Sequence, residues 1–273
     1  MLAPTQLVKE VYDYRELLVA LTYRDIRVKY KQAVMGFLWA FCIPVLSIAA
    51  GVVVQAAMAF LQHRSLNMQQ VGSVMVRSMP WSMFVGVLSG TANGILGGMG
   101  LASRIYFPRQ VIPLASVLGT LFDLSISAVV VIVLLLAIPD SPLILSWNLL
   151  LVPVFLLLLL MMALGLGLIF GSANVFFRDV KYILNVILQF GIFFTPVYLF
   201  IDQLGKLGRV VIWNPVAPLL EGIASVTVGR NGVAGIESGM WPFILYSAAI
   251  AISVLYVGMA TFRRTENLFA EVM

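Results

Sequence analysis

The sequence predicts an all-α membrane protein with six transmembrane helices, an N-terminal amphipathic interface helix and a re-entrant external helical hairpin between spans five and six. Hydrophobic residues make up 61% of the 273 residues and charged residues only 11%, against about 25% charged residues in soluble domains. Six apolar runs reach the roughly 20 residues that a spanning helix needs. A polar stretch precedes the first run, so we expect that span to remain in the mature protein.

The N-terminal segment is expected to lie on a membrane surface and then to cross the membrane. Five of the eight residues from Arg24 to Lys31 are charged, and the next Asp, Glu, Lys or Arg is Arg64. Residues 10–31 lack proline and glycine, which favours a helix. Its apolar residues form two nearly opposite stripes: Tyr14, Leu17, Leu18, Leu21 and Val28, and Val19, Tyr23, Ile26 and Tyr30. An interfacial helix needs only one stripe, so the second could face a partner protein, or the helix could break and turn.

The predicted spans are 33–61, 79–102, 112–138, 147–173, 182–201 and 241–262. With both termini on one side, that side carries twelve Lys and Arg residues, and the other side carries five, namely Arg64, Arg77, Lys206, Arg209 and Arg230. Basic residues concentrate on the cytoplasmic side of membrane proteins. We therefore expect a multi-pass protein of the cytoplasmic (inner) membrane with both termini in the cytoplasm.

The whole chain, 1–273, is interpreted as one transmembrane domain. It comprises a cytoplasmic interface segment (1–32), a six-span core (33–262) and a cytoplasmic tail (263–273).

The second span carries a glycine every four residues, at Gly86, Gly90, Gly94 and Gly98. Small residues on one helix face let a neighbouring helix approach closely, so this face serves either helix packing or sliding during gating.

Asp123 lies about ten residues into the third predicted span. A carboxylate at that depth is costly and is a functional candidate by default. Because no basic residue is expected at a similar depth, we expect Asp123 to be protonated or hydrogen-bonded to Asn93, Ser125 or Ser127.

The external segment 202–239 contains an apolar stretch, VVIWNPVAPLLEGIASVTV, that is interrupted by Pro215 and Pro218. It is too short to cross the membrane twice and too apolar to lie free in water. A re-entrant or interfacial hairpin that is buried against the spans satisfies its broken backbone best. That arrangement would bring Trp213 and Glu221 to the external mouth of any pathway.

Catalytic and metal-binding patterns are missing from the sequence. It has one histidine, His63, and one cysteine, Cys42, and no Cys, His, Asp and Glu cluster has metal-ligand spacing. The phosphate-binding pattern GxxxxGK[ST] is also missing, so we expect no enzyme activity, no metal and no ATP hydrolysis on this chain.

Two predicted cytoplasmic loops, SRIYFPRQVIP and NVFFRDVKY, combine basic and aromatic residues. This composition is typical of interaction hot spots and equally of the membrane interface.

Five segments, taken in order, resemble the permease subunits of ABC exporters for polysaccharides, the family that transports O-antigen, capsule and teichoic acid. They are YRELLVALTYRDIRVKYKQAVMGFLW, YFPRQVIPLA, NVFFRDVKYILN followed by FFTPVYL, WNPVAPLLEGI and FRRTENLFAEVM. The resemblance covers essentially the whole chain. It departs at Ala33-Val34-Met35-Gly36, where the family often has Ser-x-Leu-Gly.

This resemblance implies the transmembrane subunit of an ATP-driven exporter of a lipid-linked, O-antigen-like polysaccharide. Two copies of the chain would pair with two ABC ATPase subunits, which bind ATP and Mg, while this chain holds no cofactor. Membrane lipids would surround it, and no nucleic acid partner is expected. The residues implied for coupling to the ATPase are Arg24, Asp25, Arg104, Tyr106, Phe107, Pro108, Arg109, Arg178 and Asp179.

The resemblance also implies a translocation pathway lined by aromatic side chains, which suit the apolar faces of sugar rings. The available set is Phe37, Trp39, Phe41, Phe190, Phe193, Phe194 and Tyr198. The external gate would comprise Trp213, Asn214, Pro215 and Glu221.

Three other functions remain open at this point. A drug or small-lipid exporter would share the architecture. A secondary transporter or channel would need more ionisable residues at membrane depth than Asp123 alone. An intramembrane enzyme would need an acid, base or nucleophile set, which the sequence does not offer.

Overall fold

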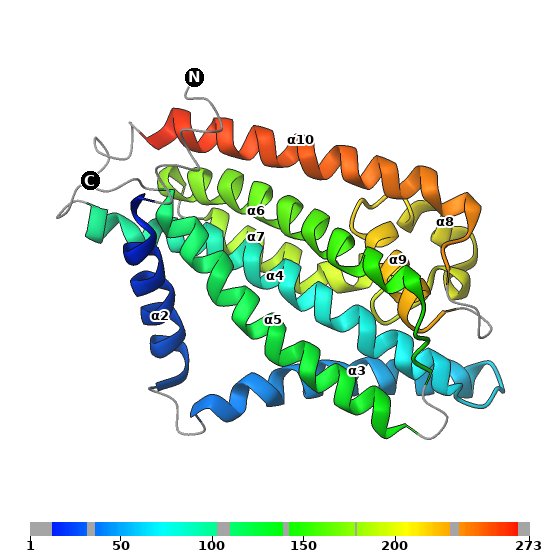
Figure 1. Cartoon of the computed structure of the whole chain (residues 1–273). Coiled ribbons are helices and arrows are strands. Elements are labelled where there is room, and N and C mark those ends of the chain that lie inside the picture. Colours follow the sequence, from blue (N-terminus) through cyan, green and yellow to red (C-terminus); the bar gives the residue numbers. More distant parts are fainter. Residues whose placement is uncertain are drawn as a thin grey trace.

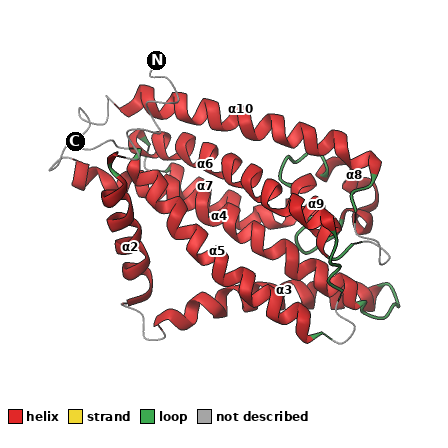
Figure 2. Ribbon diagram, viewed as in Figure 1, coloured by secondary structure: helices red, strands yellow, loops and turns green. Residues whose placement is uncertain are grey.

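The computed structural model describes residues 13–31, 36–102, 110–138, 142–177, 179–229 and 235–266, and within these ranges it contains helices and no strands (Figure 2). Five of its helical segments are long and apolar enough to cross a membrane, as expected for a chain whose backbone polar groups must be satisfied within each span. Their α-helices are α3 (Trp39–Leu61), α4 (Met68–Ala102), α5 (Val111–Ala137), α6 (Val152–Phe176) and α10 (Trp241–Glu266). The chain is therefore a multi-pass membrane protein.

Shorter elements complete the described fold. Helix α2 (Arg15–Lys31) precedes the long helices, and α7 (Val180–Gly191) continues into the 3₁₀ turn η3 (Ile192–Phe194). The segment before α10 contains η4 (Ile201–Leu207), α8 (Gly208–Val211) and α9 (Ala217–Thr227). Single 3₁₀ turns, η1 (Gly36–Leu38), η2 (Trp147–Leu151) and η5 (Ser238–Met240), lead into α3, α6 and α10.

Helices α4 and α6 form the centre of the bundle, with α10 against α6 and with α3 and α5 against α4 (Figure 1). Of the apolar stretch in α4 that is long enough to cross a membrane, 78% is buried inside the molecule. The corresponding stretch in α3 is only 17% buried. Glycines allow the closest helix approaches, because a Cβ on Gly165 of α6 would come within 2.6 Å of the Val254 carbonyl oxygen in α10. Gly258 of α10 meets the Gly165 backbone in the same way.

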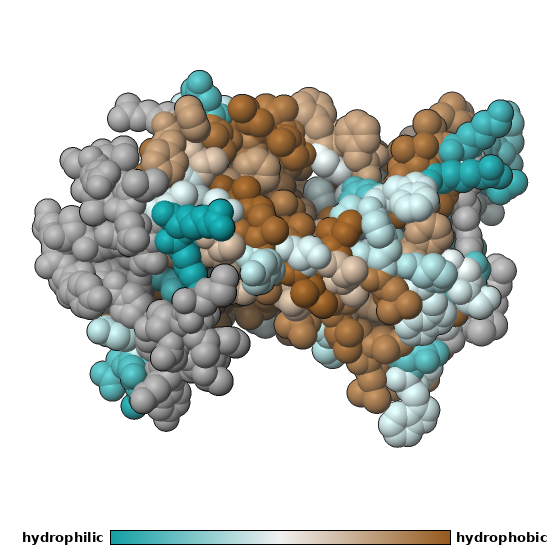
Figure 3. All heavy atoms as spheres, turned by 90° about the horizontal axis from the view of Figure 1, so that it is seen from above, coloured by the Kyte–Doolittle hydropathy of each residue, from teal (hydrophilic) through white to brown (hydrophobic). Residues whose placement is uncertain are grey.

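The long helices run alternately between two ends of the bundle, and α2 lies across one of them (Figure 1). We call this the α2 end; it also holds the start of α5, the end of α6 and the end of α10. The opposite end, the α9 end, holds the α3–α4 turn, α8 and α9. Hydrophobic side chains cover the middle of the molecule, and hydrophilic side chains gather towards the ends (Figure 3).

Two predicted spans differ from the structure. The second helix begins at Met68, eleven residues before the predicted start at residue 79, so Arg77 is inside a helix and buried instead of in an external loop. The predicted span 182–201 corresponds to α7 and η3, which end at Phe194. A 12-residue helix is only about 18 Å long, which is short of the roughly 30 Å hydrocarbon core.

Candidate functional site

One apolar stripe of α2 packs on the start of α5. Leu21 is buried against Val111 and Ala115, with the partly buried residues Tyr14, Leu17, Leu18 and Ile112 around them. The opposite side of α2 leaves Val19 and Tyr23 exposed. The helix runs unbroken from Arg15 to Lys31, so of the two alternatives for the second stripe, a break in the helix does not occur there. The packed stripe ends before Val28, which is exposed although the periodicity grouped it with Leu21.

Asp123 is paired with the last turn of α2. Lys29 Nζ lies 2.5 Å from Asp123 Oδ2, and the Tyr30 hydroxyl donates to Asp123 Oδ1 at 2.5 Å. The expectation that Asp123 has no basic partner was wrong, because α2 packs along the first half of α5 and its last turn reaches Asp123. Burial and the hydrogen bond from its hydroxyl to the Asp123 carboxylate raise the pKa of Tyr30 above its ordinary value. Tyr30 therefore stays a neutral hydrogen-bond donor at physiological pH.

The Ser and Asn neighbours that were expected around Asp123 make other contacts. Ser127 Oγ donates to the Asp123 backbone carbonyl, and Ser125 Oγ donates to the Phe122 carbonyl. Asn93 lies farther along a groove of about 690 Å³ that Asp123 also lines. This groove runs between α2, α4 and α5 and includes Arg24 and Asp25 at its rim.

The glycine face of α4 points at α5 along this groove. A Cβ on Gly86 would lie 2.9 Å from Thr120 Cγ2, and one on Gly94 would lie 2.7 Å from Ser116 Oγ. Gly90 has more space, with Ser116 Cβ at 3.6 Å. The surroundings of Gly98 lie outside the described residues. Among the three glycines whose surroundings are described, Gly86 and Gly94 make the close contacts of α4 with α5.

Two of the predicted pathway aromatics form a cluster where α2, α3 and α5 meet. The Phe37 ring makes edge contacts with Tyr30 at 5.5 Å and with Phe41 at 5.4 Å between centroids. Phe122 of α5 lies 6.4 Å from Phe37. Trp39 is directed elsewhere, into a cavity of about 130 Å³ that Lys29 and Asp123 also line.

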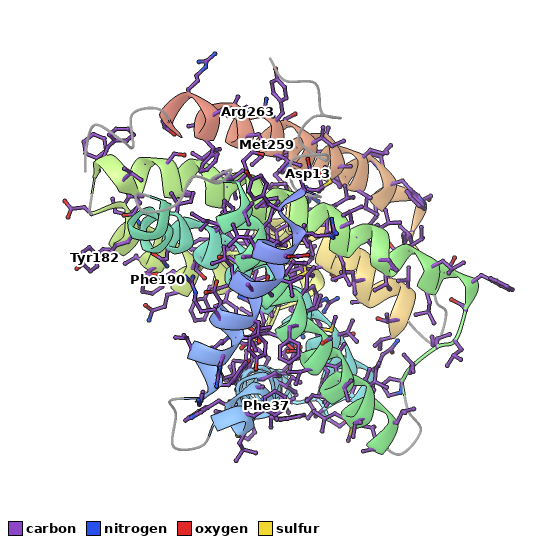
Figure 4. The ribbon with its side chains drawn as sticks, turned by 60° about the vertical axis from the view of Figure 1, so that its left-hand side comes forward. Asp13, Phe37, Tyr182, Phe190, Met259 and Arg263 are labelled. Atoms are coloured by element: carbon purple, nitrogen blue, oxygen red, sulfur yellow. The ribbon has the colours of Figure 1, made fainter. Side chains whose placement is uncertain are left out.

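Helix α7 and the turn η3 that follows it present the second aromatic group on the outer surface. Phe190, Phe193 and Phe194 are all more than half exposed, while Leu184 and Leu188 anchor the helix to the bundle. Tyr182 and Phe190 point away from the neighbouring helices (Figure 4).

Tyr198 differs from the other predicted pathway residues because it faces inward. Its hydroxyl donates to the Ser47 carbonyl of α3 at 3.0 Å. The ring lies against Gly51, where a Cβ would come 2.6 Å from it. In this structure Tyr198 packs against α3, and its side chain is only partly exposed.

The predicted gate residues Trp213, Asn214 and Pro215 connect α8 to α9. Trp213 is exposed and makes edge contacts with Phe243 and Tyr246 of α10 at 5.8 and 5.7 Å. Asn214 Nδ2 donates to the Phe194 carbonyl at 3.0 Å, and Asn214 Oδ1 accepts from the Val216 amide at 3.1 Å. Asn214 thereby joins the end of η3 to the start of α9.

Glu221 forms a buried ion pair with Arg77. Their side chains are only 15% and 8% exposed, and the Arg77 guanidinium also lies 4.3 Å from the centre of the Phe200 ring. The pair joins α4 to α9, most of whose residues are buried between α4, α6 and α10. Sequence reasoning missed Arg77; the apolar run VGSVMV directly before it was the available sign that the helix begins earlier.

Of the predicted coupling residues, three are described. Arg24 and Asp25 pair with each other on α2 at 2.8 Å, and Asp179 is exposed just before α7. All three lie at the α2 end (Figure 1). Arg104, Tyr106, Phe107, Pro108, Arg109 and Arg178 lie outside the described residues.

Within the described ranges, no three His, Cys, Asp or Glu side chains come together in a way that could hold a metal ion. The arrangement consists of a charged surface at one end, aromatic side chains along the spans and a buried short helix at the other end. These features are typical of a helical membrane transport protein.

The chain belongs to the ABC-2 type transporter family, whose family model matches residues 16–228. It is 27% identical over 270 residues to the O-antigen export system permease protein RfbA of Myxococcus xanthus, covering 97% of this chain and 98% of the relative. It is also 24% identical over 261 residues to the protein of the same name from Klebsiella pneumoniae, covering 94% of this chain and 95% of the relative.

Proposed function

We propose that this chain is the transmembrane subunit of an ATP-driven exporter that moves a lipid-linked, O-antigen-like polysaccharide across the cytoplasmic membrane. The observation that carries the proposal is similarity over 94–97% of the chain to relatives that are named O-antigen export permeases. Membership of the ABC-2 transporter family supports an ABC ATPase as the partner. ATP and Mg would be bound by that partner, and this chain would need no cofactor of its own.

The proposed topology has six crossings with both termini in the cytoplasm. Helix α7 starts at the α2 end, and the chain then continues through η3 and residues 195–200 towards the α9 end, where α10 begins (Figure 1). This path would complete the fifth crossing without a full-length helix. Helices α8 and α9 would form the re-entrant hairpin, which is supported by the burial of α9. Basic residues at the α2 end, including Arg15, Arg27, Lys181, Arg263 and Arg264, support a cytoplasmic location for that end.

In the proposed assembly, two copies of this chain pair with two ATPase subunits. The exposed side of α2 and Asp179 would contact the ATPase, together with the loop around Arg104 to Arg109 and with Arg178. Aromatics on the uncovered faces of α3 and α7 would line a pathway between the two copies. This assignment is supported by the exposure of Phe190, Phe193 and Phe194.

The contact between α2 and α5 suggests how ATPase motion would reach the spans. Nucleotide binding can shift a conformational equilibrium only through different affinities for the two states. Lys29 and Tyr30 join the last turn of α2 to Asp123. A shift of α2 that is driven by the ATPase would therefore pull on α5 beside the glycine face of α4.

The experiment that tests the proposal is co-purification of the chain with an ABC ATPase, followed by ATPase assays in nanodiscs. We expect a lipid-linked glycan to stimulate hydrolysis and a lipid carrier without sugar to have little effect. Stimulation by hydrophobic drugs instead would identify a drug exporter. Failure to recover any ATPase with the chain would overturn the proposal.

A further inference from the structure

A polar pocket of about 930 Å³ opens at the α9 end, between the α3–α4 turn and the start of the chain that follows α5. Organic ligands bind in pockets of roughly 300–1,000 Å³, so a short oligosaccharide segment fits this volume. Its composition is unusual for this chain, because five of the nine glutamines line it together with one asparagine. These amide side chains are Gln55, Gln62, Asn67, Gln69, Gln70 and Gln203.

The floor of the pocket is a reciprocal amide pair. Gln55 Nε2 donates to Gln203 Oε1 at 3.1 Å, and Gln203 Nε2 donates to Gln55 Oε1 at 2.9 Å. Gln203 Oε1 also accepts from the Phe200 amide, and Gln55 Nε2 also donates to the Tyr198 carbonyl. Gln55 is 1% exposed. These bonds hold both amides in one orientation, so the floor is organised before any ligand arrives.

The walls and rim leave polar groups available. Gln69 Nε2 donates to the Gly229 carbonyl at 3.0 Å, which holds one wall in position. The side chains of Gln62, Arg64 and Gln70 line the pocket, and none of their side-chain atoms has a hydrogen bond to a described residue. Each free amide offers two donors and an acceptor.

The chemistry of the lining selects a neutral, hydroxyl-rich ligand. Adjacent sugar hydroxyls both donate and accept, and side-chain amides can meet both needs at once. Arg64 is the one charged residue among those that line the pocket, beside six amide side chains, so most of the hydrogen-bonding capacity of the lining suits uncharged groups. A second cavity of about 210 Å³ shares Asn67, Gln69 and Gln70 and continues inward to the Arg77–Glu221 pair. Polar surface is thus continuous from the rim to α9.

We propose that this amide-lined pocket binds a neutral segment of the exported glycan at the outer end of the protein. The proposal rests on the proposed function, because export would deliver the polymer to this end. Occupancy of the pocket would hold the emerging chain while the ATPase returns to its starting state. The ligand class is an uncharged oligosaccharide segment, bound through hydroxyl–amide hydrogen bonds.

The test uses the full chain in complex with its ATPase, in detergent, and lipid-free polysaccharide released by mild acid from the strain that carries the gene. Saturation-transfer NMR and titration would give the affinity. We expect Gln62→Ala combined with Gln70→Ala to weaken binding about tenfold, which corresponds to about 1.4 kcal/mol, because two amide hydrogen-bonding groups are removed. Gln110→Ala, at the α2 end, is the matched control and should bind as the wild type does.

A second variant tests the pocket by filling it. Ser65 lies on the exposed rim, so Ser65→Trp should block glycan binding while membrane insertion and ATPase association stay intact. Wild-type affinity for the glycan in both variants, or no glycan binding by the wild type, would overturn the proposal that the pocket is the binding site. Export of polysaccharide by the wild type in cells is measured separately. If the wild type exports polysaccharide but does not bind the glycan, only the proposed binding site is refuted. If the wild type exports no polysaccharide, the proposed function is refuted.

Discussion

At the scale of single residues, charged side chains inside this chain act as connectors between helices. Asp123 joins α5 to α2 through Lys29 and Tyr30, and Glu221 joins α9 to α4 through Arg77. The two pairs differ in environment, because Lys29 is half exposed whereas Arg77 is buried. Replacing one partner of the Asp123–Lys29 pair should therefore mainly increase the mobility of α2. Replacing one partner of the Glu221–Arg77 pair should mainly lower the stability of the protein.

Asp123→Asn should loosen the end of α2. The substitution removes the charge that pairs with Lys29 and weakens the acceptor for Tyr30, so we expect faster amide hydrogen exchange in α2, measured by mass spectrometry. Asp25→Asn is the control, because Asp25 forms its ion pair with the neighbouring Arg24, within α2 itself. Equal exchange in both variants would contradict a connecting role for Asp123.

Arg77→Met should destabilise the protein by about 3–5 kcal/mol, because it leaves the Glu221 carboxylate buried without its partner. Unfolding in detergent, followed by temperature or denaturant, measures the loss. Arg209→Met, on an exposed residue at the same end, should change stability by less than about 0.5 kcal/mol. Adding Glu221→Leu to Arg77→Met should restore most of the stability, and a larger loss in the double variant would refute this account.

At the scale of elements, glycine contacts and apolar stripes decide how helices pair. The sequence pattern pointed to Gly86, Gly90, Gly94 and Gly98, yet among the described glycines the tightest backbone contact between two long helices joins Gly165 of α6 and Gly258 of α10. Those two glycines lie in separate spans, so no spacing along the chain relates them. Contact between segments far apart in sequence is visible only once they have folded together.

Gly165→Ala should destabilise the bundle by about 1–3 kcal/mol, since its new methyl group would meet the α10 backbone and push the helices apart. Gly119→Ala is the matched control, because nothing lies within 4 Å of a Cβ there. The control should be neutral or stabilising by up to about 1 kcal/mol, as alanine favours a helix over glycine. Comparable losses in the two variants, measured by thermal unfolding, would contradict the packing argument.

The two stripes of α2 should separate by mutation into stability and partner binding. Leu21→Ala removes a buried contact with α5 and should cost about 2–3 kcal/mol of stability. Val19→Ser combined with Tyr23→Ser changes only exposed residues and should lower ATPase co-purification at least tenfold while unfolding stays unchanged. Retention of the ATPase by the Val19/Tyr23 variant would remove this surface from the interface.

At the scale of the whole molecule, the described helices run back and forth between the α2 end and the α9 end (Figure 1). Five of their segments have the length and composition to span a membrane. Helix α7, together with η3, is a shorter apolar segment. Whether the chain crosses five or six times determines whether its two termini share a side. Accessibility from each side of the membrane distinguishes these cases.

Single cysteines in a Cys42→Ser background should report the topology. With six crossings, Ser65→Cys should react with an impermeant maleimide on intact spheroplasts, whereas Asp13→Cys and Arg264→Cys should react only after permeabilisation. Labelling at Arg264→Cys in intact spheroplasts would mean an odd number of crossings. Equal labelling of all three sites after permeabilisation is the control for accessibility.

The sequence by itself determined the membrane class, four of the helices to within a few residues of their ends, and the apolar stripe of α2 as far as Leu21. Apolar length and periodicity are local properties, and the bilayer converts them directly into helices. Even the family resemblance depended on residues that lie in order along the chain.

Only the tertiary structure decided which side chains meet. It gave Asp123 a basic partner, drew Arg77 into a helix beside Glu221, turned Tyr198 towards α3, and gathered glutamines from α3, α4 and η4 into one pocket. The ion pairs of Asp123 and Glu221, the Tyr198–Ser47 hydrogen bond and the Gln55–Gln203 pair of the pocket each join residues that are more than 90 positions apart in the chain. Such pairings follow from helix tilt and packing, which a single sequence does not encode in its local pattern.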